Sequence, residues 1–210
     1  MNKQDFIDDL VSRHKPVKLF RAGQKLTQWL ILTISLNFFS MYIVQGFRPD
    51  FFKQLVSYPR FLFEIVSGSL LCIFLLYFSI RILIPGVQLI KKHFIWLSIC
   101  FSVFFATLLL SWWIPSPPES SLGMRAHCNF EVFVYGTVGF VITFFYFKNF
   151  DLGVSRFQMA SISLGSGLVP ALFMQMACMY SPSHALVAHY GPVFLIGILG
   201  FLFYYCIYDY

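Results

Sequence analysis

A cysteine and two histidines lie close together near the end of the chain, in the stretch QMACMYSPSHALVAHYGPV at residues 175–193. Cys178, His184 and His189 are residue types that form disulfides, bind soft metal ions or activate a thiol. No CxxC or HxxxH motif is present, and two histidines five residues apart do not share one face of an α-helix. The spacing therefore argues against a permanent metal site. It leaves open a disulfide, transient capture of a thiophilic metal, or a filling role in a loop.

The composition of the chain indicates a membrane protein. Of the 210 residues, 58% are hydrophobic and 11% are charged, whereas soluble domains carry about 25% charged residues. The first 25 residues are polar and charged, so we expect no cleaved signal peptide. We therefore predict an all-α, polytopic membrane domain preceded by a short polar segment at residues 1–25.

Six apolar runs are long enough to cross a bilayer as helices, which requires about 20 mainly apolar residues. They are too long and too uniform for the alternating strands of a membrane barrel. Proline, glycine and charged residues separate them. The predicted spans lie near residues 26–46, 62–84, 94–113, 130–147, 158–178 and 189–208.

The positions of Lys and Arg predict the orientation of these spans, because basic residues concentrate in cytoplasmic loops. With both termini in the cytoplasm, the inner segments carry eleven of the 15 basic residues, and the outer segments carry only Arg48, Lys53, Arg60 and Arg125. We therefore predict an N-in, C-in membrane protein. The net charge of +6 then reflects orientation in the bilayer, and we expect no direct binding of nucleic acid.

This topology sorts the five cysteines. Cys72 and Cys100 fall within spans, Cys206 lies at the cytoplasmic end of the last span, and only Cys128 and Cys178 lie at the outer surface. They begin the fourth span and end the fifth, which a short loop makes antiparallel neighbours. The two thiols are therefore expected to lie close together, where an oxidising compartment permits a disulfide. The alternative is that both are small apolar fillers.

Other ionisable side chains lie near this pair. His127 precedes Cys128, Glu131 follows it, and Glu64 begins the second span. Ionisable groups at membrane depth are costly and usually have a partner or a role. We expect partners among Arg60, Arg125 and the outer histidines, or else hydration of the carboxylates at the level of the lipid headgroups.

The N-terminal segment predicts a second functional surface. In MNKQDFIDDLVSRHK, the side chains of Phe6, Ile7, Leu10 and Val11 lie on one side of a helix. Such an amphipathic helix binds a groove on a protein or lies on a membrane. Its three aspartates disfavour an anionic lipid surface, so we favour a protein partner.

Enzymes, transporters and channels are the competing classes. No pair of histidines lies at membrane depth to hold haem, and we expect no cofactor. A thiol–disulfide enzyme would need a second exchanging cysteine pair on the outer side, and none is present in the sequence. A transporter usually has broken helices in matching halves; Pro170 interrupts the fifth span, but nothing in the other half mirrors it. A small transporter or channel, and a membrane thiol–disulfide enzyme, remain as alternatives.

Several motifs, in order along almost the whole chain, resemble the NrsF family of negative regulators of sigma F. They are DFIDDLVSRHKPVKLFR, GFRPDF, YPRFLFEIVSG, RILIPG, HCNFE and CMYSPSHALVAHYGPV. The resemblance implies a six-span anti-sigma factor of a Gram-negative inner membrane. Such a protein would hold an extracytoplasmic-function sigma factor until an outside signal arrives.

The resemblance also implies roles for particular residues. The two outward cysteines of the family correspond to Cys128 and Cys178, and its Arg-Pro-Asp turn corresponds to residues 48–50. Family members tend to follow the second cysteine with proline and an acidic residue, whereas this chain has residues 179–182, MYSP. With this resemblance, we predict that the cysteine pair senses an oxidant or a thiophilic metal, supported by His127, His184, His189, Glu131 and Glu64.

Overall fold

The computed structural model describes residues 22–44, 46–82, 91–148 and 155–208. These residues form helices and loops, and the one β-type pairing among them is an isolated bridge between Ser120 and Tyr180. The all-α fold class is therefore confirmed. The predicted amphipathic helix with Phe6, Ile7, Leu10 and Val11 lies outside the described residues.

Long helices occupy all six predicted spans. In chain order the elements are α2 (Ala22–Val44), α3 (Phe51–Ser57), α4 (Pro59–Ile82), α5 (Lys91–Trp113), α6 (Cys128–Lys148), α7 (Arg156–Ala177), α8 (Pro182–His184), the π-helix η1 (Ala185–Tyr190) and α9 (Gly191–Tyr208). The short helix α3 was not predicted. The last predicted span begins earlier than expected, because α8, η1 and α9 run on from one another.

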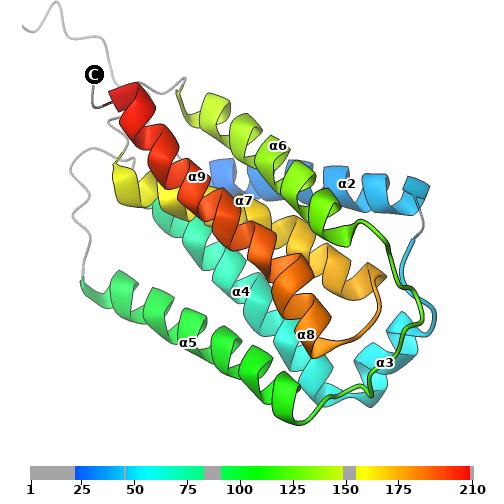
Figure 1. Ribbon diagram of the computed structural model, residues 1–210. Coiled ribbons are helices and arrows are strands. Elements are labelled where there is room, and N and C mark those ends of the chain that lie inside the picture. Colours follow the sequence, from blue (N-terminus) through cyan, green and yellow to red (C-terminus); the bar gives the residue numbers. More distant parts are fainter. Residues whose placement is uncertain (1–21, 45, 83–90, 149–154, 209–210) are drawn as a thin grey trace, which may run out of the picture.

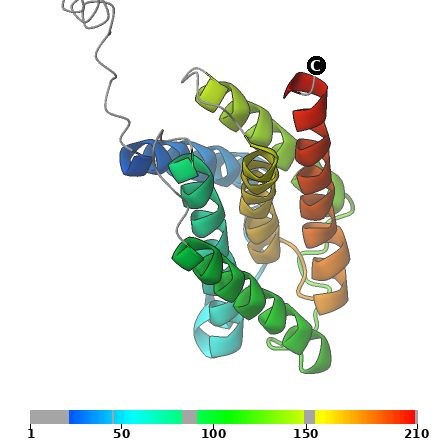
Figure 2. The ribbon, with the colours of Figure 1, turned by 90° about the vertical axis from the view of Figure 1, so that its left-hand side faces the viewer.

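Five stretches of the described helices are long and apolar enough to cross a membrane: Pro59–Ser79, Lys91–Trp113, Cys128–Tyr146, Arg156–Ala177 and Pro182–Cys206. The helix α2 has 23 residues, but its apolar part is shorter, at Thr27–Leu36. It runs obliquely across the others (Figures 1 and 2). The sixth span and the N-in, C-in orientation therefore stay predictions.

The helix α7 forms the centre of the bundle (Figure 2) and packs against α4, α6 and α9. Small residues permit this close packing, as is common between membrane helices. A side chain at Gly165 would collide with Leu76 of α4, and one at Gly167 would press on Val193 of α9. By contrast, α5 packs mainly along α4 and exposes most of its apolar side chains. The position of α7 brings its C-terminal end among the ends of its neighbours.

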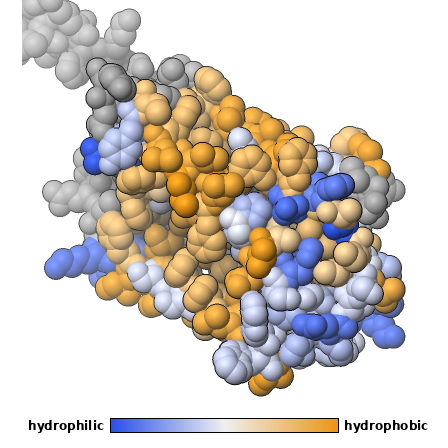
Figure 3. Space-filling model, viewed as in Figure 1, coloured by the Kyte–Doolittle hydropathy of each residue, from blue (hydrophilic) through white to orange (hydrophobic). Residues whose placement is uncertain are grey.

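The two ends of the bundle differ in character. At one end lie residues 46–58, 114–127 and 178–190, which we call the cysteine end; α4, α6 and α9 terminate at the opposite end (Figure 1). In Figure 3, hydrophobic side chains cover the middle of the visible face, and hydrophilic ones gather toward the cysteine end at the lower right. The arrangement makes α6 and α7 antiparallel neighbours, as expected from their short connection.

Candidate functional site

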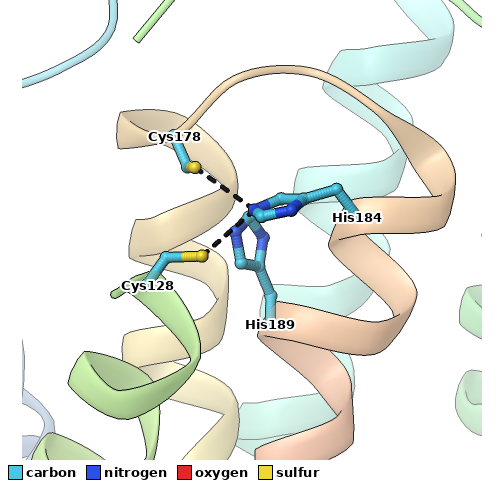
Figure 4. A group of neighbouring side chains, drawn as sticks. All are labelled: Cys128, Cys178, His184 and His189. Carbon is cyan, nitrogen blue, oxygen red and sulfur yellow. Dashed lines mark hydrogen bonds between the residues drawn. The ribbon is translucent and has the colours of Figure 1, made fainter. Parts of the chain in front are cut away.

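Four side chains meet at the cysteine end, and each comes from a different element (Figure 4). Cys128 is the first residue of α6, and Cys178 follows the last residue of α7. His184 ends α8, and His189 lies in η1. We call these residues the Cys–His cluster. The structure thus brings together the two cysteines and two of the three histidines singled out from the sequence.

A π-helix brings the two histidines together. In η1 the backbone N–H of Gly191 donates to the carbonyl of Leu186, five residues earlier, so the turn is wider than that of an α-helix. The rings of His184 and His189 consequently meet edge to face, with centroids 5.1 Å apart. The expectation that a five-residue spacing separates these side chains is therefore wrong.

The wide turn has a local cause in the sequence. Pro192 follows η1 and cannot donate a backbone hydrogen bond, and in a regular α-helix its ring would clash with the carbonyl of residue 188. A π-type turn just before a proline relieves this clash. The dipeptide Gly191–Pro192 is therefore the sequence signal that could have indicated an altered helical register.

The cluster is compact and largely buried. The Nε2 atom of His184 lies 3.0 Å from Sγ of Cys128 and 3.4 Å from Sγ of Cys178. One potential ligand atom from each of the four side chains lies within 4.8 Å of the others. Cys128, Cys178 and His189 are buried, whereas His184 is partly exposed. Solutes can therefore approach the cluster past His184.

The two thiols are not equivalent. A hydrogen bond from the Cys128 thiol lowers the pKa of Cys178 well below the ordinary value for a cysteine, and the neighbouring His189 ring acts in the same direction, although burial opposes both. A hydrogen bond that stabilises the charged form lowers a pKa in this way. Cys178 is thus the better nucleophile and metal ligand of the pair, since the thiolate is the reactive species.

Arg48 fixes the backbone beside Cys178. Its Nη1 atom donates to the carbonyl oxygens of Gln175, at 3.1 Å, and Cys178, at 3.2 Å. The guanidinium also packs over the rings of Phe61 and Tyr180. Burial lowers the pKa of Arg48 to about 10, which leaves it charged at neutral pH. Arg48 therefore ties the segment between α2 and α3 to the end of α7.

Glu64 is buried among neutral donors. Its carboxylate accepts hydrogen bonds from Nε2 of Gln175 at 2.6 Å, Oγ of Ser111 at 3.2 Å and the hydroxyl of Tyr180 at 3.4 Å. Burial raises the pKa of Tyr180 to about 12, so this residue stays a donor. Glu64 is 1% exposed, so hydration at the headgroup level is the wrong description of it. Arg60 instead donates to the carbonyl of Ile114.

The remaining predicted residues lie around the cluster. Glu131 forms an ion pair with Arg125, with 3.0 Å between Oε2 and Nη1, and Arg125 also donates to the carbonyl of Gly46. This confirms Arg125 as a partner of Glu131. His127 is exposed, and its ring is not part of the Cys–His cluster.

Sequence reasoning missed the supporting roles of Arg48 and Gln175. Arg48 belongs to the motif GFRPDF, but nothing in that motif indicates contact with α7. Gln175 is one of the few amides inside an apolar run. An amide at that depth needs partners, and this was the available signal.

A comparison with protein families decides the relationship. The model of the NrsF family, described as negative regulator of sigma F, matches residues 10–207. The chain belongs to the NrsF family. The match includes the whole Cys–His cluster, Arg48 and Glu64, whereas Phe6 and Ile7 precede its first residue. No curated protein and no solved structure matches the chain.

Membership in the NrsF family fixes the general role of the protein. The family name indicates a negative regulator of a sigma factor, that is, an anti-sigma factor, and so a regulator rather than an enzyme. A sigma factor is accordingly its partner. The apolar helices long enough to span a membrane point to membrane association of this anti-sigma factor.

Proposed function

We propose that this NrsF protein is a multi-pass inner-membrane protein that binds an extracytoplasmic-function sigma factor at the cytoplasmic face. In this proposal it releases the sigma factor when an oxidant or a thiophilic metal reacts with Cys128 and Cys178 on the outer side. The observation that carries the proposal is the meeting of both thiols with a histidine, at the start of α6 and the end of α7. Chemistry at this point acts directly on the contact between two packed helices.

The geometry suits a reversible thiol switch. On oxidation, one S–S bond forms and two thiols lose two protons, while two electrons pass to the oxidant. The ligand atoms of the cluster lie within 4.8 Å of one another, so a disulfide or a shared metal needs only a local shift. Because both helices are already packed together, such a shift would bias two nearly balanced arrangements.

The orientation in this proposal follows the basic residues. Eleven of the 15 basic residues belong to the segments predicted to lie inside, which favours the cytoplasm for the end of the bundle opposite the cysteine end. The C-terminal end of α2 lies toward the cysteine end, and its N-terminal end lies away from it (Figure 1). The segment 1–21 would therefore extend from the cytoplasmic side. There its apolar stripe would meet the sigma factor.

The partner is tested by purification of the full-length protein from its own cells in mild detergent. We expect a sigma factor of the extracytoplasmic-function class to co-purify and to be identified by mass spectrometry. Transport of a solute by the purified protein in liposomes, with no sigma factor recovered, would favour a transporter or channel. Catalytic turnover of a thiol or disulfide substrate would favour a membrane thiol enzyme.

The sensing role is tested by single substitutions of the cysteines. Cys128→Ser and Cys178→Ser should fold and retain the sigma factor, because serine is close to cysteine in size. They should fail to release the sigma factor when oxidant or Cd²⁺ is added to cells. Cys206→Ser is the matched control, since Cys206 is exposed at the opposite end of the bundle. A normal response of the double variant would exclude the cysteine pair as the sensor.

A further inference from the structure

We propose that Cys128, Cys178, His184 and His189 together form a four-ligand binding site for one divalent cation of the zinc class, such as Zn²⁺ or Cd²⁺. This inference deepens the proposed function, on which its biological meaning rests, by making the signal a metal held by two thiolates and two imidazoles. It differs from the sequence-based expectation of transient capture by the cysteines alone. The reason for this difference is that the side chains of His184 and His189 lie beside the two sulfur atoms.

The distances suit a tetrahedral site. With Zn–S bonds of about 2.3 Å and Zn–N bonds of about 2.0–2.1 Å, the ligand atoms of such a site lie about 3.3–3.8 Å apart. The distances from Nε2 of His184 to the two sulfurs are 3.0 and 3.4 Å. The full set of four ligand atoms lies within 4.8 Å. Small side-chain movements therefore suffice to surround one ion.

His189 supplies an independent observation. Its side chain is fully buried, and neither ring nitrogen makes a hydrogen bond of ordinary geometry among the described residues, although the ring lies close enough to Cys178 to lower the pKa of that thiol. Burial of an unpaired polar group costs free energy, and such groups call for an explanation. In Figure 4 the ring extends toward His184 and the sulfurs. A metal ion at the centre of the cluster would bind one of the unpaired nitrogens.

The charges select a divalent ion. Two thiolates and two neutral imidazoles carry a charge of −2, which a dication cancels, so the occupied site adds no net charge to a buried position. Cu⁺ would leave a net negative charge and a trivalent ion a net positive one. Thiolate and imidazole are also ligands that zinc-class metals favour. Binding releases the thiol protons, so affinity should fall as the pH is lowered.

Supporting residues hold the ligands in place before metal binds. The backbone N–H of Cys178 bonds to the carbonyl of Met174 at 2.7 Å, and Arg48 holds the carbonyl of Cys178. The π-helix fixes the two histidines relative to each other. Three of the four ligands thus sit on the single segment 178–189, and only Cys128 must approach from α6.

The test is a titration of the reduced full-length protein in detergent with Co²⁺, followed by competition with Zn²⁺ and Cd²⁺. We expect one equivalent of Co²⁺ to give the visible spectrum of a tetrahedral site with sulfur ligands. Zn²⁺ and Cd²⁺ should displace it. Bound Zn²⁺ should also protect Cys128 and Cys178 from alkylation, measured by mass spectrometry, while Cys206 stays reactive.

Histidine variants separate this site from one made by cysteines alone. His189→Ala should weaken Zn²⁺ binding by at least about 100-fold, more than is usual for loss of an outer-shell partner, and should alter the Co²⁺ spectrum. His127→Ala is the matched control, because His127 adjoins Cys128 in sequence but lies outside the cluster. If His189→Ala destabilises the fold, judged by circular dichroism, His184→Ala replaces it. Unchanged affinity and spectrum in a folded variant would overturn the four-ligand site.

Release of the sigma factor distinguishes the two proposals. Binding of Zn²⁺ or Cd²⁺ by all four residues without release of the sigma factor would support the metal site and contradict the proposed signal. Release by oxidant, combined with no tetrahedral Co²⁺ spectrum, would support the cysteine switch and overturn the metal site.

Discussion

At the scale of single residues, Glu64 is a buried carboxylate that depends on hydrogen bonds from other side chains. Its buried carboxylate accepts hydrogen bonds from Gln175, Ser111 and Tyr180, which belong to three other parts of the chain. These donors link α4 to α5 and to the end of α7. The carboxylate therefore acts as a common acceptor for Gln175 and Tyr180, which flank Cys178 in the sequence.

We predict that Glu64→Leu destabilises the protein, because it removes the acceptor of two buried donors, Nε2 of Gln175 and the hydroxyl of Tyr180, while Ser111 can still donate to the carbonyl of Thr107. Each unsatisfied buried group costs about 1–3 kcal/mol. Thermal unfolding in detergent should show a clear fall in midpoint, and Glu64→Gln, which keeps one acceptor oxygen, should show a smaller one. Glu119→Leu is the control, since Glu119 is exposed. Equal midpoints for Glu64→Leu and the parent would mean that the network does not stabilise the fold.

Residue-level expectations succeeded where chain topology alone was enough. The closeness of Cys128 and Cys178 followed from two antiparallel neighbouring helices, and the structure places them together. The partners of Glu64 could not be derived in this way. Ser111 and Gln175 lie far from it in sequence, and only the way the helices rotate and pack decides which polar side chains face one another.

At the scale of elements, Arg48 connects α2 to the cluster. It follows α2 in sequence and holds two carbonyls at the end of α7. Farther along α2, Trp29 donates to Thr143 of α6. The helix that leads to the N-terminal segment is thus fastened to both of the helices that carry the cysteines.

We predict that Arg48→Leu lowers stability and weakens the response to signal. The substitution removes the donor from two backbone carbonyls and should cost at least about 1–3 kcal/mol. Because α2 would lose its attachment beside Cys178, release of the sigma factor should require more oxidant or Cd²⁺. Thermal unfolding and dose–response measurements test this. Lys53→Leu, at an exposed position of α3, serves as control; identical behaviour of the two variants would contradict the link.

We also predict that the N-terminal stripe binds the sigma factor. Burial of a large apolar side chain is worth about 1.5–3 kcal/mol, so Phe6→Asp together with Leu10→Asp should greatly reduce co-purification of the sigma factor. Ser12→Asp adds one negative charge, as each of the two substitutions does by itself, on the opposite side of the predicted helix and should have little effect. Full recovery of the sigma factor with the double variant would remove this surface from consideration.

Whole helices could be predicted because apolar length alone reveals them, and their bounds agree with the sequence within a few residues except at the last span. Two elements were not predicted from the sequence. The helix α3 has only seven residues and lies between spans, where apolar length gives no signal. The π-helix escaped because side-chain patterns assume a regular α-helical period. That single local departure decided whether His184 and His189 could meet.

At the scale of the whole molecule, the orientation of the bundle in the membrane determines whether Cys128 and Cys178 face the outer side. We predict that a reporter fused ahead of Met1 and one inserted after Pro118 show activity on opposite sides of the inner membrane. The uneven placement of basic residues is the reason. A reporter after Tyr210 should agree with the first. If the first and second reporters lie on one side, either α2 does not cross the membrane or the orientation is different.

The main chain at residue 178 is held independently of its side chain. Its carbonyl is bound by Arg48 and its N–H by the carbonyl of Met174, and both bonds would persist with another side chain there. Different interactions therefore determine the position of the main chain at residue 178 and the chemistry of its side chain. Replacement of this one residue by histidine or methionine would present a different ligand at the same place. Under the proposed sensing role, a substitution at this one position would change the stimulus to which the protein responds and leave the packing of the bundle as it is.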